Sequence, residues 1–169
     1  INQSLQTWRL PMKQCNIYNS TKPAEGLSIA IVAARYNTAL VDALIEHTVK
    51  ELKVSGIEAI NLERVPGSAE LPYSASLIEK NHAVDAIIIL GVVIAGATDH
   101  HSVIAYSSAQ AINQISLEKN IPIINGIIVT NSQQEAEDRC GLKINRGKEF
   151  ALAAIEMAQL KEKGTKKNR

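Results

Sequence analysis

The apolar run that begins at Ala86 constrains the fold of this chain more than any other feature. Residues 86–90 read AIIIL, and the run continues to Ala97 with only Gly91 and Gly96 as interruptions. A strand without a polar face is buried on both sides, which is typical of a parallel sheet covered by helices on both faces. The run is also shorter than the ~20 residues that a membrane-spanning helix needs, so we expect no membrane partner.

The rest of the chain alternates short β-branched runs with segments of helical periodicity. This order predicts an α/β fold, a three-layer α/β/α sandwich around a mostly parallel sheet of roughly four strands. The expected elements are a strand at 28–34, a helix at 38–54 capped by Asn37 or Thr38, a strand at 57–62, a helix at 70–81, a strand at 85–93, a helix at 100–119, a strand at 121–130, and helices at 132–141 and 145–161.

Composition and charge exclude several classes of protein. At 169 residues with 46% hydrophobic side chains, the chain suits one globular domain. A net charge of +1 and 4% aromatic residues give no case for a nucleic-acid partner. The two cysteines, Cys15 and Cys140, lack metal-ligand spacing, so we expect free thiols in a reducing compartment and no metal site.

By composition the chain divides into three parts. Residues 1–27 are a polar N-terminal extension, residues 28–160 form the domain, and residues 161–169 are a basic flexible tail with five Lys or Arg and one Glu. Without the tail, 13 basic and 16 acidic residues remain, a charge of −3. We interpret the tail as a solvated terminus.

Ligands of such folds bind beyond the carboxyl ends of the strands, so the segments that follow the strands are the candidate site. The most informative of them is Gly96-Ala97-Thr98, which opens a helix. Free backbone N–H groups and the helix dipole predict an anion site suited to phosphate there, with ordinary helix capping as the alternative. No Lys follows at Walker A spacing, which disfavours a nucleotide triphosphatase.

Adjacent histidines begin the same helix. His100 or His101 can serve as a general acid–base group near neutral pH, and a capping or surface role is the alternative. Their side chains are expected to point in different directions.

Three further polar or aromatic residues lie near strand ends. Glu70 can accept hydrogen bonds from a polyol or simply stabilise a helix N-terminus. Tyr36 can form a flat wall for a heterocycle or belong to the core. Arg139 is a candidate phosphate clamp, with a surface salt bridge to Glu135 as the alternative.

Taken together, these segments resemble the lumazine synthase (6,7-dimethyl-8-ribityllumazine synthase) family of riboflavin biosynthesis, over about residues 27–160. The matching motifs, in order, are ARYN at 34–37, VPGSAELP at 65–72, LGVVIAGATDHH at 90–101, PIINGIIVT at 122–130, EAEDRCG at 135–141, NRG at 145–147 and AAIEM at 153–157.

The resemblance implies a flavodoxin-like fold and a specific transferase reaction without metal or organic cofactor. In that reaction 5-amino-6-ribitylamino-uracil condenses with 3,4-dihydroxy-2-butanone 4-phosphate to give 6,7-dimethyl-8-ribityllumazine and phosphate. The implied steps are imine formation, phosphate elimination, ring closure and loss of water. An anion site, an acid–base group and polar side chains for a ribityl chain fit this chemistry.

The resemblance also assigns roles to positions. His100 is the implied proton-transfer residue. The implied phosphate-binding residues are Gly96, Ala97, Thr98 and Arg139. The implied pyrimidine and ribityl contacts are Tyr36, Asn37, Ser68, Ala69, Glu70, Val92, Val93, Ile94, Asn125 and Arg146.

Several of these positions depart from the family pattern. Ala69 and His101 stand where a Phe or Tyr is common in the family. Asn125 replaces a Phe that closes the site from a neighbouring subunit. Ala95 stands where many members have Arg, and Arg146 replaces a Lys. The loss of aromatic walls motivates a second reading, a non-catalytic lumazine- or flavin-binding or shell-forming homologue. An unrelated flavodoxin-like phosphate-binding domain is the third.

Partners and location follow from the resemblance as well. It implies a homopentamer with sites between adjacent subunits, alone or assembled into an icosahedral shell. The turn GLKINRG between the last two helices, which bears on that choice, leaves it open. Riboflavin synthase is a candidate partner. We expect a cytoplasmic protein, with a plastid as the alternative if the N-terminus is processed.

Overall fold

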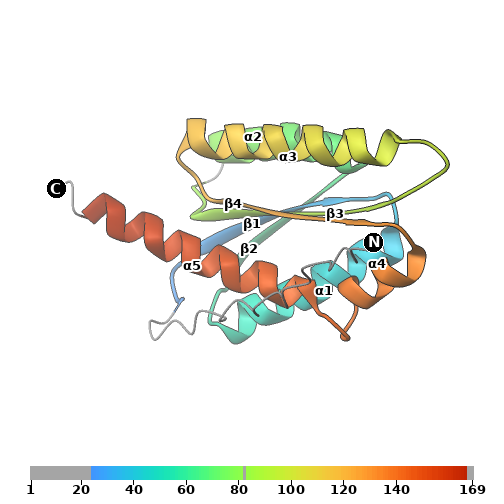
Figure 1. The fold of residues 1–169 in the computed structure, drawn as a ribbon. Coiled ribbons are helices and arrows are strands. Elements are labelled where there is room, and N and C mark those ends of the chain that lie inside the picture. Colours follow the sequence, from blue (N-terminus) through green and yellow to red (C-terminus); the bar gives the residue numbers. More distant parts are fainter. Residues whose placement is uncertain (1–23, 82, 167–169) are drawn as a thin grey trace, which may run out of the picture.

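The computed structural model describes residues 24–81 and 83–166, which form four strands and the helices around them (Figure 1). The elements are β1 (Ser28–Ala34), α1 (Thr38–Val54), β2 (Ala59–Val65), the 3-10 helix η1 (Ser68–Glu70), α2 (Leu71–Asn81), β3 (Ala86–Ile94), α3 (His100–Lys119), β4 (Ile123–Thr130), α4 (Gln133–Cys140) and α5 (Arg146–Lys166).

The predicted three-layer α/β/α sandwich is confirmed. All neighbouring strands of the sheet are parallel, in the order β2-β1-β3-β4. Figure 1 shows α2 and α3 above the sheet and α1, α4 and α5 below it. Because the chain moves outward from β1 to β2 on one side and to β3 and β4 on the other, the order reverses between β1 and β3, where ligands bind in such folds.

The central strands divide their side chains between two cores, as their continuous apolar sequence predicts. In β1, Ile29 and Ile31 pack with the core of α1 and α5, whereas Ala30 and Val32 pack with that of α2 and Ile112 of α3. All four side chains are fully buried. Each large aliphatic side chain buried in this way contributes about 1.5–3 kcal/mol.

The boundaries of β2 differ from the sequence-based expectation. The strand covers Ala59–Val65 rather than residues 57–62, because it pairs with the whole of β1, from Ser28 opposite Ala59 to Ala34 opposite Val65. The Ile57 N–H instead donates to the carbonyl of Leu52 and completes the turn that ends α1. Residues 63–65, expected to be loop, therefore extend the sheet toward its carboxyl edge.

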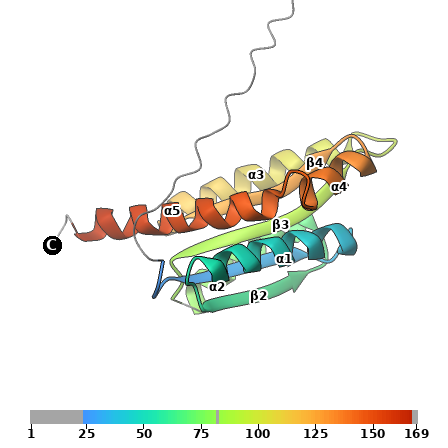
Figure 2. The ribbon, with the colours of Figure 1, turned by 90° about the horizontal axis from the view of Figure 1, so that it is seen from below.

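The last helices pack below the sheet and run on beyond it. Figure 2 shows α5 and α1 on the same face. Gly147 of α5 lies against α1, where Thr48 Oγ1 donates to the Gly147 carbonyl at 3.1 Å. The helix α5 ends at Lys166, five residues after the expected end at 161. None of the helices in the described ranges is both long and apolar enough to cross a membrane.

The division of the chain into three parts stays a prediction. Most of the proposed N-terminal extension (residues 1–23) and the end of the basic tail (residues 167–169) lie outside the described residues, as does Cys15.

Candidate active site

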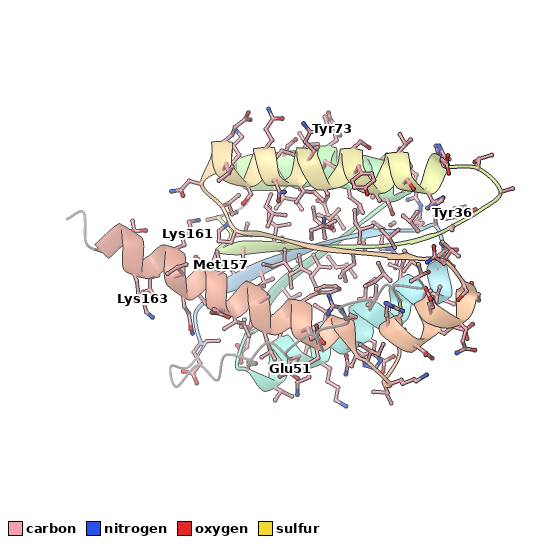
Figure 3. The ribbon with its side chains drawn as sticks, in the orientation of Figure 1. Tyr36, Glu51, Tyr73, Met157, Lys161 and Lys163 are labelled. Carbon is pink, nitrogen blue, oxygen red and sulfur yellow. The ribbon has the colours of Figure 1, made fainter. Side chains whose placement is uncertain are left out.

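A cavity of about 640 Å³ lies at the carboxyl ends of β1, β2 and β3. Figure 3 shows Tyr36 at this end of the sheet, beside the loop that leads into α3. The loops that follow the three strands, together with the first turns of α3, supply the walls. The lining residues are Tyr36, Asn37, Pro66, Gly67, Ser68, Ala69, Glu70, Val92, Val93, Ile94, Gly96, Thr98, His100, His101 and Ile104.

Asn37 connects two walls of this cavity. Its backbone adopts a left-handed conformation, with φ 56°, which Asn tolerates better than most residues. Its side chain does not cap α1 as expected; Nδ2 instead donates to the Val92 carbonyl at 2.9 Å. The loop after β1 is thereby fixed to the end of β3. Tyr36, next in the wall, is 72% exposed, so its ring is free to form the flat surface predicted from the sequence.

The second wall depends on Ser68, which is buried at the start of η1. Its carbonyl accepts a hydrogen bond from Ser108 Oγ of α3 at 3.2 Å. A Cβ at Gly91 would lie 2.6 Å from Ser68 Oγ, so a side chain at Gly91 would displace the serine. Ala69 and Glu70 follow as exposed residues that face the open part of the cavity.

The third wall is the loop from β3 to α3. Ala95 N–H donates to the Thr130 carbonyl at 2.8 Å, which holds the beginning of the loop against β4. Gly96 and Thr98 are exposed. Asp99 occupies the N-cap position of α3 but makes no side-chain capping bond. Ser102 N–H donates to the Asp99 carbonyl at 3.0 Å, so the N–H groups of His100 and His101 are the ones that keep their donor capacity beside the positive end of the helix dipole.

Both histidines of this helix line the cavity, although they differ in their surroundings. His100 is exposed, and its side chain has no hydrogen bond within the described part of the chain. His101 is half-buried, and its Nδ1 lies 3.1 Å from the Thr98 carbonyl oxygen.

Some predicted site residues lie outside the cavity of this chain: Ala97, Asn125, Arg139 and Arg146 do not line it. On β4, Asn125 Oδ1 accepts a hydrogen bond from Ile127 N at 3.1 Å. In α4, Arg139 Nη1 donates to the backbone carbonyl of Glu135 at 3.0 Å instead of pairing with its carboxylate.

Arg146 and the end of α4 belong to a separate cluster below the sheet. Arg146 forms an ion pair with Glu149, and its guanidinium lies 5.4 Å from the centre of the Phe150 ring. Burial raises the pKa of the Cys140 thiol to about 11, against a smaller opposing effect of Arg139. Cys140 is thus an inert core thiol at neutral pH.

Asp138 holds the turn that follows α4. The hydrogen bond from the Lys143 ammonium, followed by one from Gln134, lowers the pKa of the Asp138 carboxyl. The carboxylate therefore stays ionised and paired at neutral pH.

Four lining residues were not among the predicted ligand contacts: Pro66, Gly67, His101 and Ile104. Three of them, Pro66, Gly67 and His101, lie in segments that the strand-end rule does select. Ile104 lies one helical turn after His100, so helical periodicity was the signal that would have found it. Within residues 24–81 and 83–166, no three His, Cys, Asp or Glu side chains are grouped closely enough to hold a metal ion.

The fold and the cavity define an α/β/α protein with a small-molecule site at the strand-order reversal of a parallel sheet. The family model of 6,7-dimethyl-8-ribityllumazine synthase matches residues 26–162. This chain belongs to the 6,7-dimethyl-8-ribityllumazine synthase family.

Relatives with that printed name come from distant organisms. The protein of Pyrococcus furiosus is 43% identical over 136 residues, 80% of this chain and 86% of its own. That of Aquifex aeolicus is 43% identical over 147 residues, 85% of this chain and 96% of its own. That of Phocaeicola vulgatus is 38% identical over 149 residues, covering 86% and 89%. Among solved structures, a de novo designed Rossmann fold protein aligns with 74% of this chain and 98% of its own at a TM-score of 0.43 and 14% identity, a likeness too low to bear on function.

Proposed function

We propose that this chain catalyses the condensation of 5-amino-6-ribitylamino-uracil with 3,4-dihydroxy-2-butanone 4-phosphate to 6,7-dimethyl-8-ribityllumazine and phosphate. The observation that carries the proposal is that one cavity collects most of the residues to which the family resemblance assigns roles in the reaction. Nothing in the fold or among the relatives favours the non-catalytic alternative.

The phosphate of the butanone substrate is proposed to bind at the beginning of α3. Backbone N–H groups of Gly96, Ala97 and Thr98, with the Thr98 hydroxyl, lie where the uncapped helix end favours an anion. This part of the site supports phosphate elimination, because the leaving group gains negative charge where donors are already oriented.

The heterocycle and its ribityl chain are proposed to occupy the rest of the cavity. Tyr36 offers a ring for stacking, and the backbone of residues 92–94 offers hydrogen bonds to the pyrimidinedione edge. Ser68 and Glu70 are proposed to hold ribityl hydroxyls. One of the two Nδ2 hydrogens of Asn37 is already donated to the Val92 carbonyl, so the second N–H and Oδ1 remain for the substrate.

His100 is proposed to move the protons of the reaction. Attack of the uracil amine on the ketone, with loss of water, forms an imine. Loss of the phosphate, closure of the second ring and loss of another water then complete the lumazine. Each step needs a proton added to or removed from nitrogen, carbon or oxygen, and the exposed His100 ring lies in the cavity wall beside the phosphate loop. Holding two reactive substrates together contributes up to ~7–11 kcal/mol in favourable cases.

The assembly is proposed to be a homopentamer, alone or as the unit of an icosahedral shell, in which a neighbouring subunit completes each site. Asn125, Arg139 and Arg146 do not line the cavity of their own chain, which supports their supply from a neighbour. The exposed Val103 and Tyr106 of α3 offer apolar area for such an interface. We also propose a cytoplasmic location, and riboflavin synthase as a candidate partner.

The proposed reaction is tested with purified protein and both substrates, by following the fluorescence of the lumazine product. We expect product at a rate proportional to protein concentration and above the rate without protein. Binding of the product without acceleration would instead support the non-catalytic alternative.

Mixing two impaired variants, assayed at a low concentration of the butanone phosphate, tests whether sites lie between subunits. We unfold His100→Ala and Arg139→Ala together in equal amounts and refold the mixture, which is expected to regain about a quarter of unaltered activity. In a randomly mixed ring, about one interface in four joins a subunit with an unaltered His100 to a neighbour with an unaltered Arg139. Activity is measured before and after mixing, with each variant refolded alone as the control. No gain on mixing would show that His100 and Arg139 act within one chain.

A further inference from the structure

The loop that carries the proposed phosphate site, residues 95–99, has few contacts with the rest of the protein after its first residue. Its first residue, Ala95, is bound to Thr130 of β4, but Gly96, Ala97 and Thr98 are all exposed. A Cβ at Gly96 would meet no atom within 4 Å, so packing does not hold the loop there. Among the described residues, one hydrogen bond holds residues 96–98: it joins His101 Nδ1 to the Thr98 carbonyl oxygen at 3.1 Å.

The direction of this hydrogen bond determines which nitrogen of the imidazole carries a proton. A carbonyl oxygen only accepts hydrogen bonds, so Nδ1 carries the proton, and in the neutral ring Nε2 is the unprotonated nitrogen. His101 lies in the first turn of α3, half-buried, and is thus anchored to a rigid element. His100, in contrast, is exposed and has no such bond in the described part of the chain. The two adjacent rings therefore have different tasks available to them.

We propose that His101 is a positioning residue for the phosphate site. By donating Nδ1–H to the Thr98 carbonyl, it holds residues 96–98 in the form that presents their N–H groups and the Thr98 hydroxyl to the phosphate of the butanone substrate. The proposal rests on the proposed function, which assigns the phosphate to this loop. A loop ordered in advance loses less entropy when the phosphate group binds.

Three substitutions separate the two ring nitrogens. In His101→Asn the amide nitrogen takes about the position of Nδ1, in His101→Gln it reaches toward the position of Nε2, and His101→Ala removes both. One neutral hydrogen bond contributes about 0.5–1.5 kcal/mol, so His101→Ala and His101→Gln are expected to raise the KM for the butanone phosphate about threefold to tenfold. His101→Asn is expected to stay near the unaltered value. In all three, kcat and the KM for the uracil substrate are expected to change little.

Inorganic phosphate gives a readout that does not depend on turnover. Titration calorimetry of the full chain with inorganic phosphate is expected to give weaker binding in His101→Ala, by about the same factor as the change in KM, and recovery in His101→Asn. His47→Asn is the matched control, because His47 lies in α1 and does not line the cavity. Melting curves of all variants confirm that they are folded, and His101→Asn against His101→Gln decides the question if His101→Ala does not fold.

The outcomes distinguish this inference from the proposed function. Weaker phosphate binding in His101→Gln with recovery in His101→Asn supports the inference even in a protein that shows no turnover. Turnover with the same KM and phosphate affinity in every variant keeps the proposed function and overturns the inference. A fall in kcat for His101→Asn as large as for His100→Ala would make His101 the proton-transfer residue and overturns it too. If the unaltered protein shows no turnover and binds no phosphate, both the inference and the proposed function are overturned.

Discussion

Replacing His100 with Ala is expected to lower kcat about 100-fold, the lower end of what a positioned general acid–base group contributes. The lower end applies because His100 is exposed and has no hydrogen-bond partner within the described residues to orient it. Both KM values are expected to change little, because the phosphate loop and the walls around Tyr36 and Ser68 remain. Steady-state kinetics with each substrate varied in turn measures the three constants.

His47→Ala is the control for this substitution, since it removes an imidazole from α1 without touching the cavity. It is expected to leave all three constants unchanged. If a folded His100→Ala variant retains the unaltered kcat, His100 is not the proton-transfer residue.

Replacing Gly126 with Ala is expected to destabilise the protein by about 3 kcal/mol, the upper end of the usual cost of overpacking a core. A Cβ there would lie 2.5 Å from the Ile89 carbonyl oxygen and 2.9 Å from side-chain atoms of both Leu90 and Phe150. The carbonyl belongs to the backbone of β3, the paired neighbour of β4, and cannot move without breaking the sheet. In a chain of this size the loss lowers the melting temperature by about 10 °C.

The matched control for this substitution is Gly164→Ala in α5, where a Cβ would meet nothing within 4 Å. Ala is the better helix former, so this variant is expected to melt at the same temperature or slightly higher. Both melting curves are recorded at one protein concentration, because the proposed assembly would make the midpoint depend on concentration. Equal midpoints for Gly126→Ala and the unaltered protein would show that β4 does not pack against Phe150 as described.

Much of the fold was predictable from the sequence because it depends on local pattern. The continuous apolar run of β3 already required burial on both faces. The positions of β1, α1 and α3 followed from hydrophobic periodicity and from the residues that end helices and strands. The range of β2 was wrong because a strand ends where its partner ends, and the pairing of Ala34 with Val65 is not a local property.

The site was predictable to the extent that parallel strands end at the same edge. That rule predicts that Tyr36, Ser68 and His100 lie close together, and all three line the cavity. It did not predict that Asn37, at the N-cap position of α1, would make no side-chain capping bond and donate to the Val92 carbonyl instead. Residue type indicates a cap, whereas the backbone of Asn37 is left-handed. The same rule did not predict that Arg139 lies outside the cavity, because Arg139 is near the end of α4 rather than directly after a strand.

The most direct test of the central claim is whether lumazine and inorganic phosphate are formed together. Purified full-length protein is mixed with both substrates, and the two products are measured at the same times, by fluorescence and by a phosphate assay. We predict equal amounts of both, formed at a rate proportional to protein concentration and well above the rate without protein. Phosphate release without lumazine, or no acceleration of either product, would contradict the assignment of this chain as a working lumazine synthase.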